Sequence, residues 1–133
     1  METLQEITGI MEGVLMSRRT RQDFDIFAGD DLEVIVEVRD QSGELVDISE
    51  AQSITWGVSN NNRSVPELEK SYPGSGIILI DDHTFKFDIT SANSASVGAG
   101  RYYQEAEVVT SSGLVYTVLS GTVLIRPSTV GVT

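Results

Sequence analysis

The sequence predicts an all-β protein, built as an antiparallel β-sandwich of about seven or eight strands. Three observations carry this prediction. Apolar and polar residues alternate with a period of two from Gln22 onward, clusters of turn residues separate these runs, and no convincing core helix interrupts them. Two facing sheets are the arrangement that buries one side of each such strand.

Composition bounds the class of protein. The chain has 133 residues, 40% of them hydrophobic, which suits one domain with its own core. It has no cysteine, which excludes disulfides and thiolate chemistry and fits synthesis in a reducing cytoplasm. No apolar run approaches the roughly 20 residues of a membrane-spanning helix, and the N-terminus lacks the basic start of a signal peptide. The net charge of −11 repels nucleic acid and favours a basic partner.

The first 21 residues are predicted to be a separate, partly helical arm. Their apolar residues recur at spacings of three and four, although Gly9 and Gly13 weaken such a helix. Three of the nine basic residues lie in "SRRTRQ", which reads either as a solvated linker or as a contact with an acidic neighbour, another copy of the chain included. We expect the arm to lie against another subunit through Leu4, Ile7, Met11, Val14, Leu15, Arg18, Arg19 and Arg21.

Residues 22–127 are predicted to form the sandwich, followed by a tail of residues 128–133. The runs "QDFDIF", "DLEVIVEV", "QSITWGV" and "TFKFDIT" each place their apolar residues on one face. The Asn-, Ser- and Gly-rich stretch from Ser59 to Gly76 reads as a long loop with a short strand, and "SANSASVGAG" as one helical turn. Gly121 inside the last strand indicates a bulge or a close backbone approach, and Pro127 ends the sheet.

Two aromatic residues favour the immunoglobulin type of sandwich. Trp56 falls on the third main strand, where such domains bury a tryptophan, and Tyr102 opens the penultimate strand, where a tyrosine hydroxyl ties a corner. Tyr103 is then expected to point outward. Gln104 stands where an antibody domain carries its second cysteine, so packing alone would hold this domain together.

A set of short motifs recurs along residues 24–126. They are Gly29-Asp30, Asp40 with Gly43, Leu45 with Asp47, Ile48 and Ser49, Ala51 with Ile54 and Trp56, Gly100 with Tyr102, Ala106 and Val108, and Gly113 with Thr117, Val118 and Gly121. In these positions the chain resembles the small Ig-like proteins of tailed bacteriophages, a group similar to the N-terminal domain of phage upper baseplate proteins. The resemblance implies a virion structural protein of the tail, baseplate, neck or fibre-attachment region, without catalytic activity. It does not extend to the arm.

The sequence gives little support for a catalytic or ligand-binding site. The single histidine, His83, adjoins Asp82 at a predicted hairpin tip, and one imidazole leaves zinc under-ligated. Glu105 and Glu107 share an outward face rather than opposing each other across a cleft, as a glycosidase requires. A calcium site at Asp81-Asp82 or Asp40–Glu44 is chemically possible, but the spacing of these residues matches no calcium-binding loop. Exposed tyrosines that could stack on a sugar are Tyr72, Tyr103 and Tyr116.

The sequence therefore predicts a non-enzymatic structural component of a tailed-phage virion, made in the host cytoplasm, with no catalytic residues, metal or cofactor. Its expected partners are other virion proteins, with several copies in a symmetric assembly, and neither nucleic acid nor a membrane. The alternative is a carbohydrate-binding or adhesive Ig-like module at a cell surface.

Overall fold

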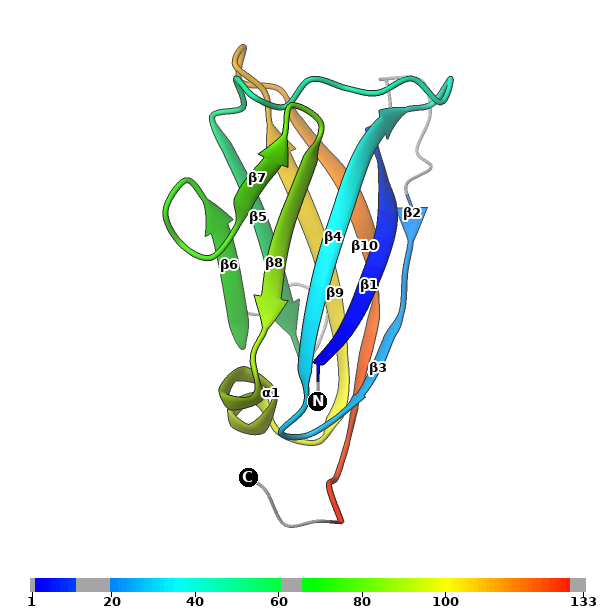
Figure 1. Ribbon diagram of the computed structural model, residues 1–133, viewed down its shortest axis with the longest axis vertical. Helices are drawn as coiled ribbons and strands as arrows, with labels where there is room; N and C mark the ends of the chain where they lie inside the picture. The colour runs from blue at the N-terminus through cyan, green and yellow to red at the C-terminus, as the bar shows by residue number, and fades with distance from the viewer. Residues whose placement is uncertain (1, 12–19, 61–65, 130–133) are drawn as a thin grey trace.

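The computed structural model describes residues 2–11, 20–60 and 66–129, and for residues 2–11 and 20 it describes the backbone alone. This part of the chain forms ten strands and one helix, arranged as two facing sheets (Figure 1). In chain order the elements are β1 (Glu2–Met11), β2 (Thr20–Arg21), β3 (Phe24–Phe27), β4 (Asp31–Asp40), β5 (Ser53–Ser59), β6 (Leu68–Tyr72), β7 (Ile78–Asp81), β8 (Thr84–Ile89), α1 (Ser91–Val97), β9 (Gly100–Val109) and β10 (Val115–Arg126).

The two sheets have simple strand orders. Sheet A runs β1-β4-β8-β7, and sheet B runs β2-β10-β9-β5-β6, with β3 following β2 along the same edge of β10. The long central strands pair antiparallel, as predicted. The N-terminal strands pair in parallel, β1 with β4 and both β2 and β3 with β10. The prediction of an all-β sandwich is confirmed.

The alternation in the sequence coincides with burial in the structure. In β4, Leu32, Val34, Val36 and Val38 are buried, whereas the residues between them are only half-buried. The same alternation holds in β3, β5 and β9. Because successive side chains of a strand point to opposite faces, one face of each sheet supplies the core and the other meets solvent.

Trp56 lies at the centre of the core. It is fully buried, and its ring stacks on Phe87 of the opposite sheet with 4.4 Å between the ring centroids. Its indole Nε1–H donates to Oε1 of Gln104 at 2.7 Å, and Nε2 of Gln104 donates to the backbone carbonyl of Gln22 at 2.6 Å. Gln104 is buried, and this chain of hydrogen bonds satisfies its amide.

The corner before β9 is closed by a tyrosine, as the sequence predicts. The Tyr102 hydroxyl lies 2.9 Å from the carbonyls of both Val97 and Gly98, at the end of α1. Burial is the main cause that raises the pKa of this phenol. Helix α1 confirms the expected helical turn, and Thr90 caps it by accepting from the Asn93 backbone N–H. Tyr103 points outward with 42% of its surface exposed.

Gly121 is the site of a close backbone approach, as predicted. A Cβ at this position would overlap the carbonyl oxygen of Gln22, in the segment that joins β2 to β3. The Gln22 N–H donates to the Ser120 carbonyl at 2.8 Å, and Asp23 accepts from the Thr122 N–H at 2.9 Å. The missing side chain therefore lets the N-terminal segment lie flat along β10.

The partly helical arm is the part of the expected fold that the structure corrects. Residues 2–11 form strand β1, which pairs along its whole length with β4, so that Ile7 lies opposite Val36. These residues pair with their own sandwich, and the expectation that they also contact another subunit stays a prediction. The pairing gives hydrogen-bond partners to the backbone groups along one edge of β4. This gain favours a strand over the helix that the spacing of a few apolar residues suggests.

We expect Trp56→Ala to lower the free energy of unfolding by about 3–5 kcal/mol, because it leaves a cavity and removes the partner of Gln104. Urea unfolding followed by circular dichroism measures the change. Tyr103→Ala is the matched control, an exposed aromatic residue whose loss should cost less than about 1 kcal/mol. A loss below about 1 kcal/mol for Trp56→Ala would contradict its central place in the core.

Gly121→Ala should destabilise the protein by at least about 2 kcal/mol, because the new Cβ collides with the backbone of Gln22. Gly113→Ala is the control: its φ is +91°, but nothing lies within 4 Å of the added Cβ, so we expect a loss of about 1 kcal/mol. Equal losses in thermal or urea unfolding would show that the close approach at Gly121 is unimportant.

Candidate interaction surfaces and polar sites

The expected partner-binding residues fall into three groups. Leu4, Ile7 and Met11 lie in β1, with backbone register opposite Glu33, Val36 and Asp40 of β4. Arg21 ends β2, and its exposed guanidinium Nη2 lies 3.4 Å from Oδ1 of Asp23. The others lie outside the described residues: Val14, Leu15, Arg18 and Arg19.

The N-terminal strands form one edge of the sandwich. β1 is the edge strand of sheet A, and it runs close to β10 and β2 of sheet B (Figure 1). β2 and β3 then continue along β10. A partner bound to these strands would therefore contact both sheets at once.

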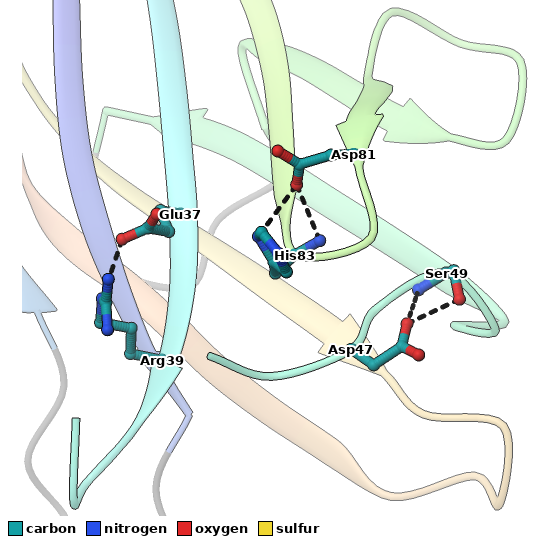
Figure 2. A network of polar contacts seen from close by, with 6 residues as sticks. All are labelled: Glu37, Arg39, Asp47, Ser49, Asp81 and His83. Atoms are coloured by element: carbon teal, nitrogen blue, oxygen red, sulfur yellow. Dashed lines mark hydrogen bonds and ion pairs between the residues drawn. The ribbon is translucent and has the colours of Figure 1, made fainter. Parts of the chain in front are cut away.

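At the end of the sandwich that holds His83, the polar side chains bond to residues close to them in the sequence (Figure 2). Asp81 Oδ1 accepts the His83 backbone N–H at 2.9 Å, and Asp47 Oδ1 accepts from the Ser49 backbone N–H and hydroxyl. Glu37 pairs with Arg39, 2.8 Å from Oε1 to Nε. Backbone hydrogen bonds from Val38 to His83 and from Ile48 to Asp82 join this hairpin to its neighbours.

The His83 imidazole lies at a hairpin tip, as the sequence predicts, and is partly enclosed, with 33% of its side chain exposed. Its Nδ1 lies 3.0 Å from Asp81 Oδ1, yet it lacks a hydrogen bond in the described part of the chain. The same Asp81 oxygen accepts the His83 backbone N–H. No three metal-ligating side chains of the described residues gather at this or any other point.

The remaining acidic pairs are divided between turns and an open face. Asp30 and Asp31 accept backbone N–H groups of Phe27 and Ser91, respectively. Asp40 accepts from Ser42 and from the Glu44 N–H, which closes the turn after β4. Glu105 and Glu107 project, as expected, from the outer face of sheet B, the face turned away from sheet A.

A shallow hollow on that outer face is the feature that sequence reasoning missed. It encloses about 460 Å³ and is lined by residues of β2, β5, β6, β9 and β10, among them Gly57, Glu69, Tyr103 and Arg21. The only signal in the sequence is Gly57, a glycine in the middle of a strand of alternating residues. Of the three expected tyrosines, Tyr103 is the exposed one; Tyr72 and Tyr116 pack partly against the core.

The chain matches no protein-family model and no curated protein. Among solved structures it is similar to the N-terminal domain of phage TP901-1 ORF48, with a TM-score of 0.54 and 8% sequence identity. The similarity covers 92% of this chain and 98% of that one. At such low identity the two proteins are shown to share a fold. None of the described helices is long and apolar enough to cross a bilayer.

Acid should destabilise the protein through its turn aspartates. The Ser42 hydroxyl holds the pKa of Asp40, and the Ser49 hydroxyl that of Asp47, below the ordinary value of 3.8. A carboxyl whose pKa is lower when folded stabilises above about pH 4, and this contribution is lost as the pH falls through the folded pKa.

We therefore expect the urea midpoint to fall between about pH 4 and pH 2, and to fall less in the double variant Asp40→Asn/Asp47→Asn. Glu44→Gln is the control, since no hydrogen bond of the described chain uses its carboxylate. An unchanged acid dependence in the double variant would contradict the role of these two turns.

Proposed function

We propose that this protein is a non-enzymatic structural component of a tailed-phage virion that acts through protein–protein contacts. The observation that carries the proposal is the fold, shared over 92% of the chain with the N-terminal domain of phage TP901-1 ORF48. The motifs that resemble small phage Ig-like proteins lie in the same stretch and give independent support. The absence of catalytic function is supported by the turn carboxylates, whose oxygens accept hydrogen bonds from their own loops.

The proposal includes the immunoglobulin type of sandwich. Its support is the strand order: β1-β4-β8-β7 matches the ABED sheet of that fold, and β10-β9-β5 matches its GFC sheet, with β6 added beside β5 and with β2 and β3 added beside β10. Trp56 on β5 and the Tyr102 corner at β9 occupy the places typical of the class. Gln104, two residues after Tyr102, bonds to the tryptophan where an antibody domain has a disulfide.

Within the particle, this protein would be a rigid body in the tail, baseplate, neck or fibre-attachment region, present in several copies in a symmetric assembly. Its N-terminal segment, with the basic residues Arg18, Arg19 and Arg21, would be the connector to other virion proteins. The position of β1 and β2 supports this role, because they lie along both sheets. The net charge of −11 favours proteins over nucleic acid as partners.

The second candidate is a carbohydrate-binding or adhesive module at a cell surface. Its support is Tyr103, an exposed ring beside the hollow, since sugars stack on such rings. An isolated domain of this kind would bind glycans as a monomer.

Gradient-purified phage particles should contain the protein in a fixed ratio to the other virion proteins, as measured by quantitative mass spectrometry. Absence of the protein from the particles would contradict the proposed function. In an Arg18→Glu/Arg19→Glu/Arg21→Glu variant we expect incorporation to fall about tenfold, because reversed charges repel an acidic partner. Arg101→Glu, on strand β9, is the control. Normal incorporation of the triple variant would contradict the connector role but not the virion assignment.

A further inference from the structure

The hollow on the outer face of sheet B is built by one row of residues that crosses five strands. The ladder places Glu69 beside Gly57, Gly57 beside Glu105, Glu105 beside Ser120, and Ser120 beside Arg21. Glu107 lies one step along β9 on the same face. Residues from both halves of the chain therefore meet around one open position.

Gly57 leaves that position open. Apart from its chain neighbours, the nearest described atoms to a Cβ placed on it belong to the Pro66 ring, at 3.7 Å. The backbone packing around Gly57 thus has room for a side chain, and what the glycine provides is space between Glu69 on one side and Glu105 on the other.

Among the described residues, carboxylates outnumber cations around this space. Glu69, Glu105 and Glu107 all line the hollow, and none of them forms an ion pair with another described residue. The one cation in the lining is Arg21, at the β2 end of the row, and its guanidinium already faces Asp23. Tyr103 adds an exposed aromatic ring to the same wall.

We propose that the hollow is a docking site for an arginine side chain carried by another protein of the assembly. A guanidinium is planar, carries several donors for carboxylate oxygens, and stacks on an aromatic face, so Glu105, Glu107, Glu69 and Tyr103 together offer what it recognises. The identity of the partner as a virion protein rests on the proposed function, but the chemistry of the site does not.

Other ligands fit this lining less well. Anionic ligands, nucleic acid included, would be repelled by the three carboxylates. A lysine would be attracted by charge but would gain less from the tyrosine face and from paired carboxylate oxygens. We therefore expect arginine to be preferred over lysine, and both over an uncharged side chain.

The test is an NMR titration of the ¹⁵N-labelled full chain with the peptide acetyl-Gly-Arg-Gly-amide. We expect weak, saturable binding that shifts the amide signals of Gly57, Glu105, Glu107 and Ser120, and that weakens as salt is added. The same peptide with citrulline, which keeps the shape of arginine without its charge, should cause no such shifts. Shifts spread evenly over the acidic surface would overturn the proposal.

Two variants make the test specific. Glu105→Gln/Glu107→Gln should weaken peptide binding about fivefold, since exposed ion pairs are individually weak. Glu44→Gln/Glu50→Gln removes the same charge from exposed positions outside the hollow and should leave binding unchanged. Gly57→Leu should abolish binding by filling the space, with the fold checked by the dispersion of the remaining signals.

The outcomes also separate this inference from the proposed function. Equal affinities of the two double variants for the peptide would overturn the arginine site even if the protein is found in the particle. Peptide binding at the hollow by a protein absent from the particle would support the site and contradict the virion role. A neutral oligosaccharide that shifts these amides when the peptide does not would assign the hollow to sugars.

Discussion

The hydrogen bonds that run from Trp56 through Gln104 to the carbonyl of Gln22 organise the sandwich. They begin at the ring that stacks across the core on Phe87 and end at the segment between β2 and β3. A buried amide costs free energy unless each of its groups finds a partner. Gln104 finds both of them only when β5, β9 and the N-terminal segment are in place, so one side chain couples the core to the edge of sheet B.

The same residue links the inside of the protein to its outer face. Gln104 lies between Tyr103 and Glu105 on β9, and its hydrogen bonds fix the register in which their side chains project outward. The approach of Gln22 to Gly121 brings Arg21 to the end of that row. The hollow is therefore held by the core beneath it rather than by a flexible loop.

Most of the sandwich could be predicted from the sequence because its signals are local. The alternation in "DLEVIVEV" marks a strand wherever it lies, and Trp56 and Tyr102 each suit one kind of environment. The fate of residues 2–11 could not be predicted in the same way: Leu4, Ile7 and Met11 fit a helical face equally well, and only the empty edge of β4 decides for a strand. The hollow was missed because Glu69 and Glu105 become neighbours only through the register of separate strands around Gly57.

The parallel pairing of the N-terminal strands has a mechanical consequence. Glu2 lies opposite Asp31 and Arg126 opposite Phe27, so the first and last strands of the sandwich have these ends at the same pole, near α1 (Figure 1). A force that pulled these ends apart would act across the strands and break their hydrogen bonds one after another, which offers little resistance. The sandwich should therefore resist a load applied through the faces of its sheets better than one applied at these two strand ends.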